Sequence, residues 1–381
     1  MLVLELVIIL LAAKLAGSIS VKMGQPSVLG QLVAGIVIGP SLLGWVNNSE
    51  ILQELSNVGV ILLMFIAGLE TNLREFRASA KASTAVGIGG IILPLAGGYA
   101  SGMMLGLSPF ESMFFGLVLT ATSVSISVQT LRELGKLKSK EGATILGAAV
   151  LDDIAVIILL ALLMSLIDSG VSVGMVVLKK FLFFAAAILI AWKVVPWVMN
   201  RFAHSGIQQA PLVLAVILCF SFAYFAEATG VAGIIGAYLA GIAISTTRMQ
   251  EEMIEKVEVL SYGIFVPIFF VSIGISTQIS GVDGMWMVIP LSLLAILAKL
   301  IGSGLGAKWV GFSWRSSLGI GAGMVSRGEV ALILAALGLE QGIIEGSMFS
   351  VLIMVVLVTT IVTPPILKVL FQEKNVVAVE K

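Results

Sequence analysis

The chain has 381 residues, of which 59% are hydrophobic and 12% are charged, and its mean hydropathy is +1.11. A soluble globular domain carries roughly twice that share of charged residues, so these values exclude a soluble fold. The 22 basic and 22 acidic residues balance, which gives no reason to expect a nucleic-acid partner. A single cysteine, Cys219, excludes an internal disulfide. The composition predicts a protein embedded in a lipid bilayer.

In chain order, the hydropathy of the sequence predicts about thirteen membrane-spanning helices, each close to the ~20 apolar residues that a helix needs to cross a bilayer. The predicted spans are residues 2–21, 26–44, 51–71, 84–106, 109–130, 142–167, 172–198, 209–228, 230–246, 259–277, 285–307, 316–339 and 347–370. The first span lacks the basic start and the small-residue cleavage site of a signal peptide. We therefore expect it to remain in the protein as an uncleaved helix.

The charges in the loops between these spans set the expected orientation. Alternate loops hold most of the lysines and arginines, and the segment 132–140 alone contains one arginine and three lysines. The loops on the other side carry mainly acids, such as Glu50, Glu111 and Asp283. By the positive-inside rule, the basic side faces the cytoplasm. The sequence therefore predicts a multi-pass protein of the cell (inner) membrane, with its N-terminus outside and its C-terminus inside.

Two adjacent carboxylates, Asp152 and Asp153, lie near the middle of the predicted span 142–167. A charge at that depth costs several kcal/mol unless it is paired, protonated or coordinated, so two side by side indicate an ion-binding site. A dehydrated Na⁺ and a proton would compete for the same oxygens, and both aspartates are candidate Na⁺ ligands. The alternative is a pair of acids that caps a helix or faces water, but the apolar flanking residues offer no soluble surface.

A buried positive charge is expected near this pair. Lys299 lies in the middle of the span 285–307, at about the depth of the two aspartates. An unpaired lysine there would lose its proton or seek a carboxylate, so we expect a contact with Asp152 or Asp153. The alternative is that its long side chain extends to the membrane interface. These residues alone leave open which aspartate Lys299 contacts.

The chain repeats itself at an offset of 206 residues. GQLVAGIVIG at 30–39 aligns with GAYLAGIAIS at 236–245, and FIAGLETNL at 65–73 aligns with VSIGISTQI at 271–279. Each half then has six spans and the seventh links them, so equivalent helices are seven spans apart and insert with opposite topology. Inverted repeats are typical of secondary transporters, whose binding site lies at the midplane. The alternative is chance similarity between helices rich in Gly, Ala and Ile, against which the constant offset argues.

This repeat predicts the organisation of the chain. The first six-helix repeat covers residues 1–170, a linker helix covers 171–205, the second repeat covers 206–373, and 374–381 form a cytoplasmic tail. The fold class that follows is an all-α polytopic membrane protein with two inverted six-helix repeats.

Two spans are expected to be interrupted in the middle of the membrane. The segment 119–127, LTATSVSIS, is rich in hydroxyls, and the segment 319–329, GIGAGMVSRGE, is rich in glycines around Arg327 and Glu329. Interrupted helices are tolerated at depth where their freed backbone groups are buried in protein or line a cavity. We expect Arg327 and Glu329 to compensate half-helix dipoles and each other. Close packing of continuous helices through small residues is the alternative.

Three hydroxyl residues of the first interrupted span, Thr120, Thr122 and Ser123, are further candidate ligands for a cation. Together with freed carbonyl groups, they would add the hard oxygen ligands that an alkali cation prefers. This set of residues implies transported Na⁺, Li⁺ or K⁺ and protons, and no cofactor.

Four motifs in this order carry a resemblance to a known family: TATSVSISVQTLRELG, GAAVLDDIAVIILLAL, AKLIGSGLGAK and GAGMVSRGEVALILA. The chain resembles, over nearly all its length, bacterial sodium/proton antiporters of the second cation:proton antiporter family, with the NapA-like and GerN-like branches nearest. The resemblance implies an NhaA-like antiporter fold in which the broken helices cross, and a homodimer. It also implies a dimerisation domain at about 1–72 and 208–278, and a mobile core domain at about 84–168 and 284–371 that carries the ion by an elevator movement.

The resemblance also implies roles for the buried charges. In that family the second aspartate, here Asp153, is the principal cation and proton carrier, and the first, here Asp152, pairs with the lysine that matches Lys299. The implied activity is exchange of Na⁺ or Li⁺ for H⁺ by a transporter that is not an enzyme and that contributes to pH homeostasis. Two aspartates and a lysine suggest more than one proton per Na⁺, hence electrogenic exchange. The alternative within the family is exchange of K⁺ for H⁺, or of Na⁺ for H⁺ and K⁺.

Two other classes of protein fit the sequence less well. A passive cation channel would need a continuous pore lined by carbonyls or acids, and the inverted repeat argues against it. An intramembrane aspartyl protease needs two aspartates that converge from different helices, whereas adjacent residues on one helix point about 100° apart.

Overall fold

The computed structural model of the protein describes residues 2–23, 25–71, 73–164, 173–202, 209–276 and 285–371, and the regular secondary structure in these ranges is helical. The helices are α1 (Leu2–Lys22), α2 (Ser27–Ile38), α3 (Glu50–Glu70), α4 (Leu73–Ala78), α5 (Ala80–Met104), α6 (Pro109–Thr120), α7 (Val124–Glu133), α8 (Lys140–Met164), α9 (Val173–Leu189), the π-helical turn η1 (Ile190–Val194), α10 (Val195–Phe202), α11 (Ala210–Ala228), α12 (Gly233–Ser245), α13 (Gln250–Leu260), the π-helical turn η2 (Ser261–Phe265), α14 (Val266–Ile275), α15 (Met285–Trp309), α16 (Trp314–Gly323), α17 (Glu329–Glu340) and α18 (Gly346–Phe371).

Apolar helices of membrane-spanning length dominate the described residues. Ten helical segments are long and apolar enough to cross a bilayer, and shorter apolar helices cover Ser27–Ile38, Gly233–Ser245 and Val330–Leu339. The expectation of an all-helical chain with many apolar spans is confirmed.

Two predicted span boundaries are wrong. The span expected at 26–44 ends as a helix at Ile38, because Gly39 caps it in an extended conformation and Pro40 cannot continue it. The span expected to begin at 259 extends back to Gln250, since the polar α13 continues through η2 into the apolar α14.

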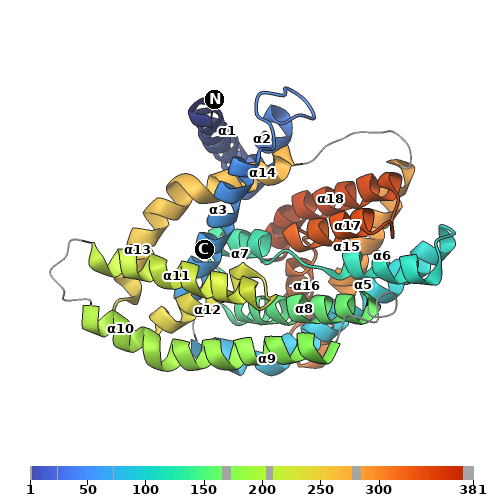
Figure 1. Ribbon diagram of the computed structural model, residues 1–381. Helices are drawn as coiled ribbons and strands as arrows, with labels where there is room; N and C mark the ends of the chain where they lie inside the picture. The colour runs from blue at the N-terminus through green and yellow to red at the C-terminus, as the bar shows by residue number, and fades with distance from the viewer. Residues whose placement is uncertain are drawn as a thin grey trace, which may run out of the picture.

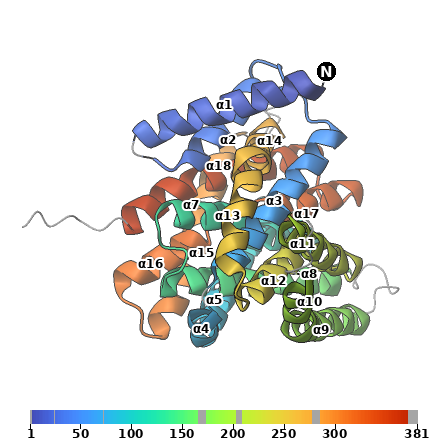
Figure 2. The same ribbon diagram turned by 90° about the vertical axis from the view of Figure 1, so that its left-hand side faces the viewer.

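The helices form two bundles (Figure 1). In the first, which we call the α5–α15 bundle, α5 packs along α15 and also contacts α6 and α8, while α15 contacts α16 and α18. In the second, the α3–α12 bundle, α3 packs against α12 and α2 against α14, with α1 and α11 alongside. Helix α7 lies between them, in contact with α18 and α8 on one side and with α2 and α3 on the other (Figures 1 and 2).

Glycines bring the backbones of the α3–α12 bundle into direct contact. A Cβ atom at Gly35 would lie 2.0 Å from the carbonyl oxygen of Val271, and one at Gly241 would lie 2.2 Å from the carbonyl oxygen of Phe65. The members of the two contacts are related by the sequence offset of 206. The same reciprocity relates the contact of Gly68 with Tyr238 to the contact of Gly274 with Leu32. No residue with a side chain fits at these positions, which explains the glycines.

Two helices are interrupted where the sequence predicts interruptions. Helix α6 ends at Thr120 and α7 begins at Val124, while α16 ends at Gly323 and α17 begins at Glu329. The first pair starts from a well-defined cap, because the Ser108 side chain and Glu111 form a reciprocal capping box. The residues between the half-helices include Thr122 and Ser123 in the first pair, and Ser326 and Gly328 in the second. Residues of these types favour caps and extended backbone over helix interiors.

Candidate ion-binding site at the crossing of two interrupted helices

The two interruptions contact each other through buried hydrogen bonds. The backbone N–H of Ser123 donates to the carbonyl oxygen of Ser326 at 2.7 Å, and the Ser326 hydroxyl donates to the carbonyl oxygen of Ser123 at 2.8 Å. The Ser127 hydroxyl donates to the carbonyl oxygen of Gly323 at 2.5 Å. These bonds join the α6–α7 and α16–α17 segments at a crossing inside the α5–α15 bundle, and they satisfy part of the backbone that each interruption frees.

Arg327 lies in this crossing and is fully buried. Its Nε and Nη2 donate to the carbonyl oxygen of Leu119 at 3.1 and 2.5 Å, Nη1 donates to Val325 at 3.0 Å, and Nη2 also reaches the carbonyl oxygen of Ala295 at 3.2 Å. A cation on the last carbonyls of α6 offsets the negative end of that half-helix, which is the role expected for Arg327. The side chain of Glu329 lies outside the described residues, so its expected part in this compensation stays a prediction.

The buried acids and the buried lysine meet beside the crossing. Asp152 and Asp153, both on α8, are 0% and 1% exposed, and Lys299 on α15 is 0% exposed. The Lys299 Nζ donates to both carboxylate oxygens of Asp152, at 3.0 and 3.1 Å. Lys299 therefore contacts Asp152 and does not extend to the membrane interface. Asp153 follows on the same helix, about 100° around its axis, and so faces a different direction.

The three candidate hydroxyl ligands all lie at the interruption between α6 and α7, where each is buried. The Thr122 side chain approaches Asp152 closely enough to interact with it, although its Oγ1 completes no hydrogen bond of regular geometry. The Ser123 Oγ has no hydrogen-bond partner among the described residues. Thr120 differs, because its hydroxyl donates to the carbonyl oxygen of Gly116 at 2.9 Å, which leaves only its lone pairs for a ligand. The crossing thus holds buried oxygen atoms with unused capacity.

Sequence reasoning missed several residues that build this site. The hydroxyl of Thr360 on α18 donates to the carbonyl oxygen of Arg327 at 2.5 Å. On α5, a Cβ at Gly90 would lie 2.4 Å from the Ser303 Oγ and 3.6 Å from the Lys299 Nζ, so a glycine there leaves room for Ser303 next to the lysine. A signal existed for Ser326, because the offset of 206 aligns it with Thr120.

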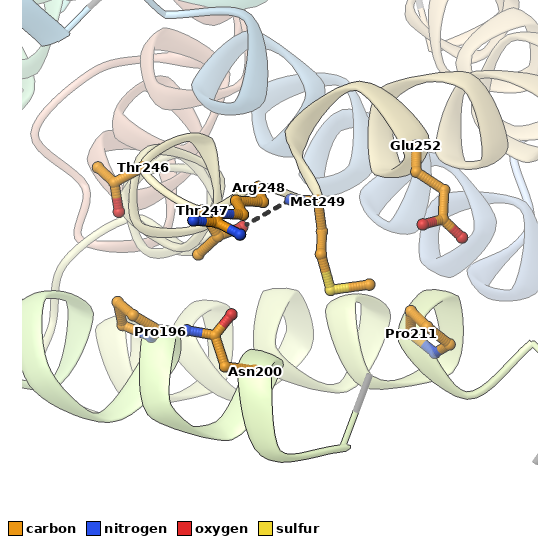
Figure 3. A pocket seen from close by; sticks show the side chains of 8 residues that line it. All are labelled: Pro196, Asn200, Pro211, Thr246, Thr247, Arg248, Met249 and Glu252. Atoms are coloured by element: carbon orange, nitrogen blue, oxygen red, sulfur yellow. Dashed lines mark hydrogen bonds between the residues drawn. The ribbon is translucent and has the colours of Figure 1, made fainter. Parts of the chain in front are cut away.

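A cavity of about 760 Å³ lies elsewhere in the molecule (Figure 3). Pro196 and Asn200 of α10 face the turn between α12 and α13 across it, and Pro211 of α11 closes one end. Arg248 and Glu252 are its charged residues. None of its lining residues belongs to the crossing, so this cavity is not the site of the buried charges.

Three features together define the class of membrane ion transporters. The chain is helical with many apolar spans, two interrupted helices cross, and four buried charged residues lie at the crossing. Residues 7–373 match the family model described as "Sodium/hydrogen exchanger, transmembrane". The chain belongs to this family, and it is therefore a membrane-embedded member of an antiporter family, not of an enzyme family.

Individual relatives agree with this assignment. The chain is 54% identical to the Na(+)/H(+)-K(+) antiporter GerN of Bacillus cereus over 373 residues, which cover 97% of this chain and 96% of that protein. It is 39% identical to the Na(+)/H(+) antiporter of Enterococcus hirae, with 95% and 96% of the two chains covered. The predicted resemblance to bacterial cation/proton antiporters is confirmed.

A solved structure shares the fold. The sodium proton antiporter MjNhaP1 from Methanocaldococcus jannaschii matches with a TM-score of 0.63 at 19% sequence identity, and the match covers 95% of this chain and 94% of that one. At that identity the likeness concerns the fold alone.

Proposed function

We propose that the protein exchanges Na⁺ or Li⁺ for H⁺ across the cell membrane, driven by the existing ion gradients and without ATP. The observation that carries this proposal is the buried site: Asp153 next to the Lys299–Asp152 pair, at the crossing of two interrupted helices. A carboxylate at that depth is stable when it is protonated, paired or bound to a cation. Protons and alkali cations therefore compete for the same oxygen atoms, and this competition couples their movements.

Each residue of the site has a distinct proposed role. Asp153 is the principal carrier of the cation and of the proton, and Asp152 is the charge partner of Lys299. Thr120, Thr122 and Ser123 supply hydroxyl oxygens to the dehydrated cation. Arg327 compensates the α6 dipole through its hydrogen bonds to the carbonyl oxygen of Leu119 and so stabilises the interrupted backbone. Because Asp153 binds the ion while Arg327 holds the interrupted helices, a bound cation can displace protons without disrupting the crossing of the helices.

The domain organisation proposed for this exchange is the one expected from the sequence. It has thirteen spans, two inverted six-helix repeats covering 1–170 and 206–373, and a linker at 171–205. The reciprocal glycine contacts support the repeat, because a two-fold relation between the halves converts the contact of Gly35 with Val271 into that of Gly241 with Phe65. Helix bounds support it as well, since α8 begins at Lys140 and α18 begins 206 residues later at Gly346. In this proposal the N-terminus faces the exterior and the C-terminus faces the cytoplasm. The tail 374–381 is not among the described residues.

The two bundles supply the moving and the fixed parts. The α5–α15 bundle falls within the core domain expected at about 84–168 and 284–371, and it contains every charged residue of the site. The α3–α12 bundle falls within the dimerisation domain expected at about 1–72 and 208–278. An elevator movement of the first against the second, in a homodimer, would expose the site to each side of the membrane in turn. Two aspartates and a lysine support more than one proton per Na⁺, hence electrogenic exchange.

A second candidate is exchange of Na⁺ for H⁺ and K⁺. The observation that favours it is the identity of 54% to a relative that is itself named a Na(+)/H(+)-K(+) antiporter. Both candidates use the same buried site and differ in whether K⁺ also occupies it. A passive channel would use no such competition between protons and cations.

The test is an assay in proteoliposomes that contain purified protein and a lumenal pH dye. Addition of Na⁺, Li⁺ and K⁺ in turn should produce saturable proton movement with Na⁺ and Li⁺, and movement with K⁺ would select the second candidate. Liposomes containing the Asp153→Asn protein serve as the control for passive leak. Cation flux that neither saturates nor moves protons would refute exchange and indicate a channel.

A further inference from the structure

Helix α7 carries a second charged cluster at the end far from the crossing. The helix begins at Val124, directly after the interruption, and its 10 residues end at Glu133, which places the two ends ~15 Å apart. Arg132 lies in this last turn, on the basic side of the molecule that is predicted to be cytoplasmic. A cavity of about 610 Å³, lined in part by Glu70 and Lys138, opens at the same end. The same rigid helix therefore joins the proposed ion site to this charged end.

Arg132 contacts three residues, one on α3 and two on α13 and η2, which pack against α3 and extend the α3–α12 bundle. Its Nε lies 3.2 Å from a carboxylate oxygen of Glu70 at the end of α3, and its Nη2 pairs with Glu258 of α13. The guanidinium group also lies 4.3 Å from the centre of the Tyr262 ring in η2. The Arg132 side chain is 25% exposed, so these contacts are partly shielded from water. We call these four residues the Arg132 cluster.

The neighbouring Glu133 makes a second connection between the bundles. Its carboxylate accepts hydrogen bonds from the backbone N–H of Ser27 at 2.6 Å and from the Ser27 hydroxyl at 2.5 Å, at the start of α2. Helix α2 has no acid in its own first turn, and Pro26 provides no capping side chain. A carboxylate from α7 therefore supplies the negative charge that a helix N-terminus favours. Gln129, one turn earlier on α7, donates to the same carboxylate at 2.8 Å.

The outer half of the same boundary between the bundles is built differently. There Ile273 of α14 meets Leu332 of α17 and Val356 of α18 around a small crevice. Most side chains around this crevice are apolar, and contacts between apolar side chains are not directional, so such side chains can slide past one another. The ion pairs of Arg132 cannot, because such a pair is lost when its atoms separate beyond about 4 Å. Among the described residues, Arg132 and Glu133 thus place ion pairs and hydrogen bonds between the bundles at the end of α7.

We propose that Arg132 is a positioning residue for transport: by binding Glu70 and Glu258 it stabilises the conformation seen here, and these pairs must separate before the site can face the other side. The proposal rests on the elevator exchange proposed above. Helix α7 continues directly from the interruption that holds Thr122 and Ser123, so any displacement of the site relative to the α3–α12 bundle also displaces Arg132. Loss of the cluster would then shift the population away from this conformation. Coupling between cation and proton would not change.

The first experiment compares Arg132→Gln with Lys256→Gln in oriented proteoliposomes. Lys256 pairs with Glu252 at 2.7 Å within α13, so its loss removes an ion pair of the same end that does not connect the bundles. Arg132→Gln should raise the apparent KM for Na⁺ on one side and lower it on the other, which changes the ratio of the two values about five- to tenfold. Lys256→Gln should change the ratio less than about twofold. Arg132→Lys should restore part of the ratio, because it keeps the charge but not the planar fork.

Transport by the wild-type protein separates this proposal from the exchange on which it rests. If the wild-type protein moves no protons in response to cations, the exchange itself fails. If it does, and Arg132→Gln matches Lys256→Gln in its KM ratio, then the positioning role is wrong. The Na⁺ gradient at which proton flux stops should be the same in all variants, since a population shift does not alter stoichiometry. Where Arg132→Gln does not fold, Glu70→Gln and Glu258→Gln each remove one pair while keeping the arginine, and a ratio unchanged in both overturns the proposal.

A cross-link provides a direct test of separation. In a Cys219→Ala background, cysteines placed at Ser27 and Glu133 should be joined by a short bis-thiosulfonate reagent, because the Ser27 hydroxyl contacts the end of the longer Glu133 side chain and the reagent spans the length that cysteine lacks. The cross-linked protein should lose transport, and a reductant that cleaves the mixed disulfides of the reagent should restore it. Transport at the full rate by the cross-linked protein would show that α2 and α7 need not separate.

Discussion

The Lys299–Asp152 pair and the Arg132 cluster are both built from opposite charges, but they differ in where the partners lie. Lys299 and Asp152 are fully buried, and both belong to the α5–α15 bundle. The charged side chains of the Arg132 cluster are 12 to 32% exposed, and they join α7 to the other bundle. In the proposed elevator movement the first pair travels intact, whereas the second must break. A transporter of this design keeps the ion pair that is most costly to break within one bundle, and it places its weaker pairs at the boundary between the bundles.

Magnitudes agree with this division. Removing one partner of a buried ion pair leaves a buried charge and costs about 3–5 kcal/mol. An exposed pair contributes about 0–1 kcal/mol and can open in every transport cycle. Loss of transport, loss of stability, a response to voltage and a response to salt, in decreasing order of expected size, would each test the contrast between the two kinds of ion pair.

The largest effect is expected for Asp153→Asn. The amide cannot exchange a proton or compensate a cation, so cation-dependent proton movement should be abolished while the protein stays folded. The pH-dye assay in proteoliposomes measures the first outcome, and size-exclusion chromatography in detergent measures the second. Substantial alkalinisation driven by Na⁺ in this variant would remove Asp153 from its role as carrier.

A double-mutant cycle tests the buried pair. Lys299→Ala alone should destabilise the protein by about 3–5 kcal/mol, because it strands the Asp152 carboxylate. Adding Asp152→Asn should recover part of that loss, since the stranded charge disappears. Melting temperatures of the four proteins in detergent give the coupling. Strictly additive losses would mean that the 3.0 Å contact carries no coupling energy.

Voltage tests whether the proposed exchange moves net charge across the membrane. In liposomes clamped with valinomycin and K⁺, an imposed potential should change the driving force for exchange by about 2.3 kcal/mol per 100 mV for each elementary charge moved per cycle. The Na⁺ gradient at which proton flux stops should therefore shift with the imposed potential. K⁺ must first be shown not to be a substrate. A null-flux gradient that depends on the pH gradient alone at every voltage would make the exchange electroneutral.

The smallest effect is expected from salt, which should weaken the partly exposed ion pairs and not the buried pair. Raising the ionic strength to about 0.5 M with an inert salt should screen the partly exposed Arg132 cluster and leave the buried Lys299–Asp152 pair unchanged. The ratio of the two apparent KM values of the wild-type protein should then approach that of Arg132→Gln by up to about fivefold. Lys256→Gln serves as the control for general salt effects. An equal salt response of wild type and Arg132→Gln would contradict a screened cluster.

Sequence reasoning reached the buried charges and both interruptions because each violates a rule of membrane helices. Asp152, Asp153 and Lys299 stand out as charges at mid-depth, and hydroxyls or glycines mark the interruptions. The residues alone could not choose which aspartate Lys299 contacts. An α8 that is apolar on all faces gives no periodicity from which its rotation could be read. That choice came from the resemblance, which implied Asp152.

The Arg132 cluster could not be predicted from the same information. Its acidic partners, Glu70 and Glu258, are 62 and 126 residues away along the chain. In the sequence Arg132 is one of several cations in a basic segment, where the positive-inside rule already accounts for it. Helix α13 was also missed, because its polar residues lower the hydropathy below that of a span. Pairings at helix ends depend on how the bundles pack, which local sequence does not encode.

The glycine contacts of the α3–α12 bundle bear on its mechanical behaviour. Where the backbone at Gly35 rests on the carbonyl oxygen of Val271, and that at Gly241 on Phe65, no side chain lies between the helices. Such a joint has no rotamers to exchange, so it cannot repack in response to a neighbouring load. The two helices either stay in this backbone contact or separate completely. In the proposed elevator movement, this bundle would therefore act as a rigid frame whose shape stays constant while the α5–α15 bundle is displaced relative to it.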